Sequence, residues 1–128
     1  MLQMSRTFIL VAGLSLMLAG MLGAYGFHGL PGKVPDAELN SWNWAVQMQF
    51  FHGIGLILVA LLLDRARSSI LLKAAGGLMI LGTILFSLNV YQETLGGSEL
   101  IGNLAPMGGS SFMLSWLLTG IGAYRALK

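Results

Sequence analysis

No lysine, arginine, aspartate or glutamate lies between Arg6 and Lys33, and the segment from Thr7 to Gly26 is dominated by Leu, Ile, Val, Ala, Gly and Met. At 1.5 Å per residue, about 20 helical residues span the roughly 30 Å hydrocarbon core of a bilayer. A cleaved signal peptide is the competing interpretation, because a basic residue precedes the apolar core and small residues follow it. The length of the run and the apolar sequence after it favour a retained membrane helix.

The rest of the chain is also apolar. Hydrophobic residues make up 55% of the 128 residues and charged residues only 9%, with a mean hydropathy of +0.77. Soluble domains carry about 25% charged residues, so a soluble fold of this size could not cover its surface and lipid is the expected solvent. We predict an all-α membrane protein with one domain over residues 1–128, whose four helices span the bilayer at about 7–26, 45–63, 70–91 and 104–124.

The connections predict an up-down-up-down bundle. The loop from Asp64 to Ser69 is short enough to force an antiparallel hairpin. Asp36 and Glu38 favour a helix start near Asp36, where the helix dipole attracts negative charge. Lys33 falls on one side of the expected membrane, and the other basic residues fall on the side of the termini: Arg6, Arg65, Arg67, Lys73, Arg125 and Lys128. The positive-inside rule therefore predicts cytoplasmic termini, or matrix-side termini in an organelle.

The predicted topology brings polar side chains from all four helices to the outer side of the membrane. The candidate polar cluster comprises His28, Gln49, His52, Ser87, Asn89, Tyr91 and Asn103. Unpaired polar groups inside a bilayer cost several kcal/mol, so these groups must bond to one another, to water or to a ligand. A hydrogen-bonded network that fixes helix order is the first interpretation, and a small-molecule or lipid-headgroup site is the second. Two histidines without a carboxylate or thiolate partner fall short of a metal site.

Small residues at intervals of three and four predict the helix-packing faces, because membrane helices associate through close backbone approach. The predicted packing positions are Gly20, Gly23, Gly26, Gly108, Ser111, Ser115 and Thr119. A polar solute path along the hydroxyls of the last helix is the alternative. Hydroxyls at this spacing more often bond to carbonyls of their own helix, which favours packing.

Motifs for catalysis and cofactor binding are missing from the sequence. There is no P-loop, nucleophile elbow, zinc-protease helix or dinucleotide fingerprint. The chain has no cysteine, which excludes disulfides and thiolate ligands, and its net charge of +2 forms no basic stripe for nucleic acid. We therefore expect no enzyme activity, no cofactor and no nucleic-acid partner.

Four short motifs follow one another along the chain. They are Gly23-Ala24-Tyr25-Gly26-Phe27-His28-Gly29-Leu30, Gln47-Met48-Gln49-Phe50-Phe51-His52, Phe86-Ser87 with Tyr91, and Leu104-Ala105-Pro106-Met107-Gly108-Gly109 before Trp116. In this order they resemble the small integral membrane family catalogued as domain of unknown function 423. That family shows Gly-Ala-Phe-Gly-Ala-His-Gly, Tyr-Gln-Met-Tyr-His, Phe-Ser-Gly-Ser-Leu-Tyr and Thr-Pro-Leu-Gly-Gly. The resemblance implies a four-span protein of bacterial cytoplasmic membranes, with no assigned activity. Asn89 and Ala105 depart from the family pattern, so no role is carried over to them.

The sequence thus favours a non-enzymatic structural or accessory subunit in the inner membrane of a bacterium. Its expected partners are the lipid bilayer and either further copies of itself or a larger membrane complex. The alternative is a carrier or channel for a small solute, or a lipid- or quinone-binding protein, with a polar site in the outer leaflet.

Overall fold

The computed structural model describes residues 1–127, apart from the side chain of Leu100, and all regular elements in this part of the chain are helices. They are α1 (Gln3–His28), α2 (Asp36–Arg65), α3 (Ile70–Gly82), the π-helix η1 (Thr83–Leu88), α4 (Asn89–Thr94), α5 (Glu99–Gly102) and α6 (Ala105–Ala126). The segments α3, η1 and α4 form one continuous rod. The predicted all-helical fold class is confirmed.

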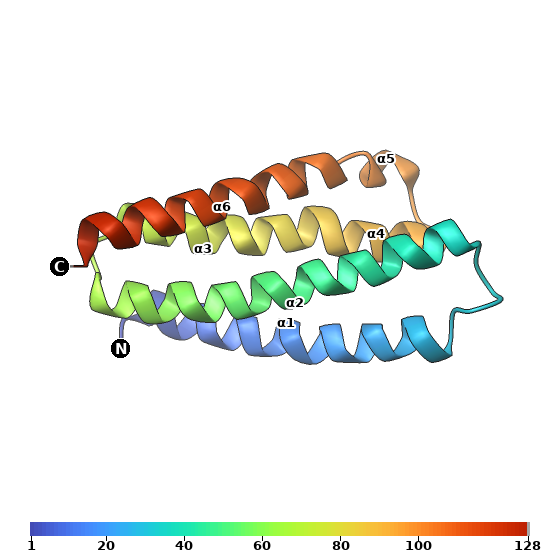
Figure 1. Cartoon of the computed structure of the whole chain (residues 1–128), viewed down its shortest axis with the longest axis horizontal. Coiled ribbons are helices and arrows are strands. Elements are labelled where there is room, and N and C mark those ends of the chain that lie inside the picture. Colours follow the sequence, from blue (N-terminus) through green and yellow to red (C-terminus); the bar gives the residue numbers. More distant parts are fainter. Residues whose placement is uncertain (128) are drawn as a thin grey trace.

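The long helices run side by side in an elongated bundle, with connections at alternating ends (Figure 1). α1 packs most closely against α2, and α3 against α6. The short helix α5 lies at the end opposite the termini, and the two ends of the chain lie together at the other end (Figure 1). The antiparallel hairpin predicted between the second and third helices is present.

Local chemistry explains where the helices begin. Gly32 has φ +80°, a left-handed conformation that favours glycine, and it turns the chain before α2. α2 then begins at Asp36, as predicted, directly after Pro35. The hydroxyl of Ser69 caps α3 by accepting a hydrogen bond from the amide of Leu72 at 3.2 Å. Pro106 lies in the first turn of α6, where a missing amide hydrogen bond matters least.

Three helical segments of the described chain are long and apolar enough to cross a membrane: Gln3–His28, Asp36–Arg65 and Ile70–Thr94. α6 is not among them, because its glycines and hydroxyl residues lower its hydropathy. The fourth span therefore stays a prediction.

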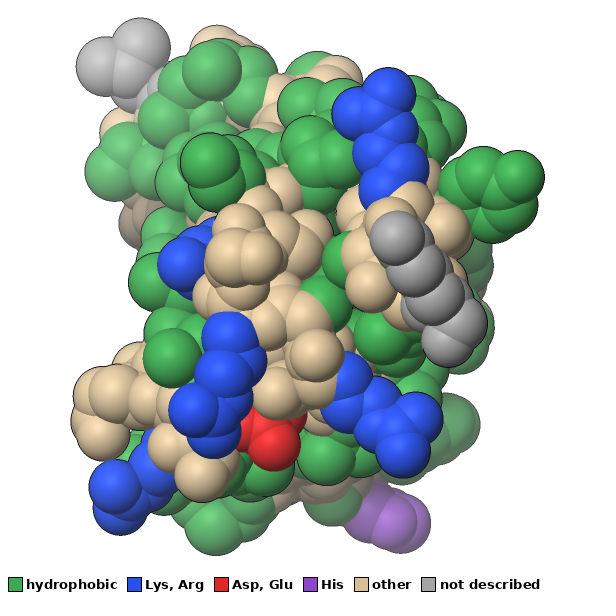
Figure 2. Space-filling view, turned by 90° about the vertical axis from the view of Figure 1, so that its left-hand side faces the viewer, with side chains coloured by type: hydrophobic (Ala, Val, Ile, Leu, Met, Phe, Trp, Pro, Cys, Tyr) green, Lys and Arg blue, Asp and Glu red, His purple; other side chains and the backbone are tan. Residues whose placement is uncertain are grey.

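The end of the bundle that carries the termini is rich in basic side chains. Figure 2 shows lysine and arginine side chains around a single acidic group on this face. Asp64 at the end of α2 is 3.6 Å from the guanidinium of Arg67, and its carboxylate accepts a hydrogen bond from the amide of Leu2 at 2.9 Å. Lys128, which was counted in the predicted charge asymmetry, lies outside the described residues.

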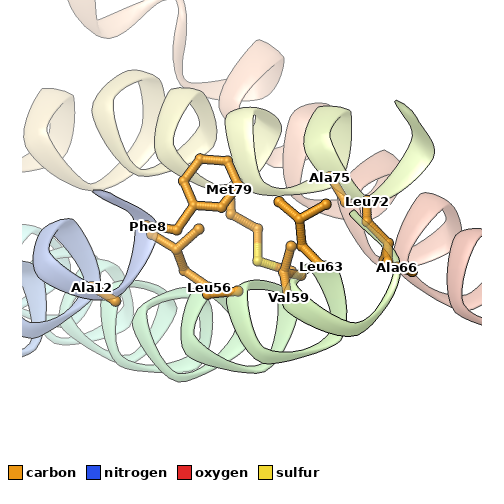
Figure 3. Packing of buried hydrophobic residues seen from close by; sticks show 10 residues of the cluster. Phe8, Ala12, Leu56, Val59, Leu63, Ala66, Leu72, Ala75 and Met79 are labelled. Atoms are coloured by element: carbon orange, nitrogen blue, oxygen red, sulfur yellow. The ribbon is translucent and has the colours of Figure 1, made fainter. Parts of the chain in front are cut away.

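Two apolar clusters fill the bundle. The larger lies toward the termini and joins α1, α2 and α3, with Phe8, Leu56, Leu63 and Met79 among its members (Figure 3). The smaller lies toward the opposite end, around Trp42. The polar residues Gln49 and His52 lie on α2 between these two clusters.

Candidate functional site

Gln49 connects three helices at the centre of the bundle. It is 1% exposed, and its amide nitrogen donates to the carbonyl of Ser15 on α1 at 2.9 Å. Its amide oxygen accepts from the hydroxyl of Tyr91 on α4 at 2.7 Å. A primary amide has both donors and an acceptor, so one side chain can hold two neighbouring helices in register.

His52 connects α2 to α6. Its Nε2 is 2.9 Å from the indole nitrogen of Trp116, and its Nδ1 is 2.7 Å from the carbonyl of Met48. An indole N–H can only donate, so Nε2 must accept and Nδ1 must carry the proton that is donated to Met48. These partners assign a neutral imidazole with both nitrogens bonded. The ring also stacks on Phe112, with centroids 3.6 Å apart.

The π-helix η1 interrupts the regular helical turn between α3 and α4. Gly82, just before it, lies against Phe112 of α6, whereas Ser87 within it lies against α2. The hydroxyl of Ser87 donates to the carbonyl of Ala45 on α2 at 2.8 Å. The amide nitrogen of Asn89 donates to the carbonyl of Leu85 at 2.6 Å, within its own helix. The sequence predicts a regular helix over residues 70–91, so the π-turn is a difference between prediction and structure.

The candidate polar cluster is therefore only partly assembled. Gln49, His52, Ser87, Asn89 and Tyr91 are buried along α2 and the rod that faces it. His28, the last residue of α1, and Asn103, just before α6, are both exposed, and the structure does not bring them into this group.

Three partners of the cluster were not predicted from the sequence. Ser15 and Trp116 bond to cluster residues, and the ring of Trp42 packs on Tyr91 with centroids 4.7 Å apart. The indole N–H of Trp42 donates to the carbonyl of Leu22 on α1 at 2.9 Å. A general signal could have indicated the two tryptophans: an indole N–H within a membrane span has no water to bond to, so a tryptophan inside an apolar helix indicates an acceptor nearby.

The candidate packing residues differ in their surroundings. A Cβ atom at Gly26 would lie 2.7 Å from the Trp42 ring, and one at Gly108 would lie 2.6 Å from the backbone nitrogen of Phe86. A Cβ at Gly23 would lie 3.2 Å from Val46, whereas one at Gly20 would meet nothing within 4 Å. Close helix approach thus depends on Gly26 and Gly108, and Gly20 lies on an open face.

The hydroxyls of α6 bond within their own helix. Ser111 donates to Met107 at 2.9 Å, Ser115 to Phe112 at 2.7 Å and Thr119 to Ser115 at 2.7 Å, in each case to a backbone carbonyl. Each hydroxyl proton is therefore already used locally, and Ser115 is fully buried.

Hollows lie on both sides of His52. One of about 610 Å³ lies between α2, η1 and α6, and one of about 260 Å³ lies between α1, α2 and the α3–η1 rod. Their walls are almost wholly apolar apart from the edges of polar side chains such as His52. Within the described residues, no group of three or more His, Asp or Glu side chains could hold a metal ion.

A helical bundle with long apolar helices, exposed apolar side chains and internally bonded polar groups defines the class of multi-pass α-helical membrane proteins. Residues 22–109 match the family described as "Protein of unknown function (DUF423)", and the chain belongs to that family. The resemblance inferred from the sequence is confirmed.

The relatives are named as membrane proteins. The chain is 36% identical over 122 residues to the UPF0382 membrane protein YwdK of Bacillus subtilis (strain 168), covering 95% of this chain and 99% of the relative. It is 34% identical over 120 residues to the UPF0382 membrane protein SH2409 of Staphylococcus haemolyticus, covering 94% of this chain and 97% of the relative. No solved structure matches. The protein is thus a membrane protein of a family of unknown function.

Proposed function

We propose that the protein is a non-enzymatic structural or accessory subunit of a membrane assembly. The observation that carries the proposal is the pairing of its interior polar groups. Among the described residues, Ser5 Oγ is the one buried side-chain nitrogen or oxygen without a hydrogen-bond partner. Groups that are already paired in this way stabilise a fixed helix arrangement and offer little to a substrate.

The state of His52 supports a role without catalysis. A general base needs a ring nitrogen that can reach a substrate proton. Here Nε2 is occupied by the indole of Trp116 and Nδ1 by the carbonyl of Met48. Using the ring for proton transfer would first require breaking a bond that holds α2 to α6.

The proposal includes four spans, cytoplasmic termini and a place in the inner membrane of a bacterium. Two features support four spans and this orientation. α6 exposes large apolar side chains, with Met113 71% and Leu117 58% exposed, as expected for contact with lipid. The chain ends lie together at the basic end of the bundle, and basic ends favour the cytoplasm (Figures 1 and 2).

The absence of cysteine from the sequence makes this topology directly testable. Single cysteines at Lys33, Arg67, Ser98 and Tyr124 would be labelled in intact cells with a membrane-impermeant maleimide. We expect labelling at Lys33 and Ser98, and labelling at Arg67 and Tyr124 only after permeabilisation. Labelling of Ser98 and Tyr124 from the same side would remove the fourth span.

The expected partners are further copies of the chain or a larger complex. Gly13 and Gly20 lie on the exposed side of α1, where an added Cβ would meet nothing within 4 Å. These glycines are not used for packing inside the chain, although glycine weakens a helix by about 1 kcal/mol relative to alanine. Close packing of a helix from a neighbouring chain against this face would explain why glycine occurs at these two positions.

The subunit role is tested by combining native gels with transport assays. We expect tagged protein, extracted gently from its own membrane, to migrate as a larger assembly. Proteoliposomes should be no more permeable to glycerol than protein-free liposomes. A monomer whose glycerol flux is lost in His52→Ala would overturn the subunit role and favour the alternative, a small-solute carrier that uses the hollow beside His52.

A further inference from the structure

The contact between α2 and α6 is open along much of its length. A hollow of about 510 Å³ near the termini is lined by Leu58, Leu61, Arg65 and Thr119, among others, and by Trp116. Trp116 also lines the hollow of about 610 Å³ beside His52. The two hollows therefore meet at this side chain, and together we call them the seam groove.

The seam groove has a charged end and an apolar body. Arg65 lies at the end that carries the termini, and Leu58, Leu61 and Trp116 follow along the wall. From Arg65 to His52 the helical rise gives about 20 Å, somewhat more than half of the roughly 30 Å hydrocarbon core. An apolar chain that begins at Arg65 can thus extend through its own leaflet inside the groove.

The electrostatics at the charged end favour an anion. Asp64 also lines this end, but its carboxylate accepts from the Leu2 amide and lies 3.6 Å from Arg67. With Arg65 and Arg67 beside one Asp64, the local charge is positive. The same face carries the other basic side chains of this end of the bundle (Figure 2).

We propose that the seam groove binds one anionic phospholipid of the leaflet that faces the termini. Its phosphate pairs with Arg65, and one acyl chain follows Leu58 and Leu61 to the ring of Trp116. This lipid site goes beyond the proposed role as a structural or accessory subunit. It lies in the leaflet that faces the termini, whereas the polar site considered from the sequence lies in the outer leaflet. A zwitterionic lipid would gain less from Arg65, because its own cation offsets its phosphate.

Brominated lipids test the proposal, because bromine quenches a tryptophan that it contacts. Purified protein in dodecyl maltoside would be titrated with brominated phosphatidylglycerol or brominated phosphatidylcholine while its fluorescence is recorded. We expect half-maximal quenching at about 5-fold less phosphatidylglycerol, since one basic residue near an anionic lipid is worth about 1 kcal/mol. Trp116→Phe should remove most of the lipid-selective quenching.

Two variants locate the site. Arg65→Gln should abolish the preference for phosphatidylglycerol, whereas Arg6→Gln, which removes a charge from the same end but not from the groove, should preserve it. Thr119→Phe should block the groove and reduce quenching by both lipids. Circular dichroism and size-exclusion profiles would show that each variant is folded.

Other occupants give different results. Equal quenching by the two lipids would mean that the groove holds only ordinary bilayer lipid. A preference that survives Arg65→Gln would mean that it arises from other basic side chains and not from a phosphate site at Arg65. Cross-linking between cysteines placed at Leu61 in two chains, together with no quenching of Trp116, would mean that a second copy covers the groove. Each of these results would overturn the lipid site. None of them would decide the proposed subunit role, which is tested by the native gels and the glycerol flux.

Discussion

α2 meets α1 and α6 in two different ways. Toward α1 the backbones come close, because Gly26 has no side chain to keep Trp42 away, and the Trp42 indole bonds to the carbonyl of Leu22 at 2.9 Å. Toward α6 two hollows separate the helices, and one hydrogen bond, from Trp116 to His52, crosses between them. The difference shows how one helix can be fixed firmly on one side and left open on the other.

Physical chemistry explains why the two contacts should differ in strength. In lipid, apolar burial contributes little between helices, so stability comes from close van der Waals packing and from hydrogen bonds. Backbones in close contact gain many weak dispersion contacts, whereas a hollow beside a side chain gains none on its open face. The α1–α2 contact should therefore carry more of the stability than the α2–α6 contact.

The largest effect is expected from filling the α1–α2 contact. Gly26→Leu would place side-chain atoms where the Trp42 ring and the Asn43 amide already lie, and overpacking of this kind costs about 3 kcal/mol. Gly20→Leu on the same helix is the matched control, because a Cβ there meets nothing within 4 Å. Unfolding in mixed micelles with increasing SDS measures both. Equal losses in the two variants would refute the asymmetry between the contacts.

A second prediction compares the two tryptophans. Trp42 is fully buried and touches Tyr91 at a centroid distance of 4.7 Å, whereas Trp116 is 42% exposed. Trp42→Phe should cost about 1–2 kcal/mol, since the indole donor to the Leu22 carbonyl and part of the aromatic contact with Tyr91 are lost. Trp116→Phe should cost about 0.6 kcal/mol, the typical value of one hydrogen bond between membrane helices.

The same unfolding assay tests this ranking. If Trp116→Phe were the more damaging change, the His52–Trp116 bond would hold the bundle together and the α2–α6 contact could not be the weaker one. Trp44→Phe serves as the baseline for replacing an indole, because Trp44 is 47% exposed and its indole bonds to no other group in the described part of the chain.

The helices themselves were predictable from sequence because apolar length and charge position are local properties. The start of α2 at Asp36 follows from Pro35 and the acidic first turn, and the short loop after Asp64 determines the antiparallel hairpin. The hydrogen-bond partners of the buried side chains were harder to predict from the sequence. Gln49 was recognised as polar and buried, but its choice of Ser15 and Tyr91 depends on how three helices rotate against one another.

The burial of Asn89 was harder to predict from the sequence. On a helix, Asn89 points away from the face shared by Ser87 and Tyr91, yet all three side chains are buried, and Asn89 bonds to the carbonyl of Leu85 in its own helix. Sequence spacing shows which residues share a face, but how many faces are covered depends on the packing of the neighbouring helices. The predicted topology puts His28 in the cluster because the first helix ends on the same side of the membrane, but His28 is exposed at the end of α1.

A third prediction measures the coupling between Gln49 and Tyr91. A double-mutant cycle with Gln49→Leu, Tyr91→Phe and the double variant isolates their 2.7 Å hydrogen bond. We expect a coupling of about 0.6 kcal/mol, up to about 1.7 kcal/mol for a well-formed bond in a membrane protein. A coupling of zero would show that the two side chains bond to other partners, and the α1–α2–α4 connection would rest on packing alone.

The smallest effects are expected where a hydroxyl bonds to its own helix. Ser111→Ala removes a bond to Met107 that joins no second helix, so its cost should stay within about 0.5 kcal/mol. Ser87→Ala removes a bond across to Ala45 of α2 and should cost more, because it leaves a buried interhelical contact incomplete. Parallel SDS titrations rank the two variants. If Ser111→Ala proved the costlier change, the hydroxyl row of α6 would face a partner outside this chain, and the open side of the bundle would have to be assigned to protein rather than to lipid.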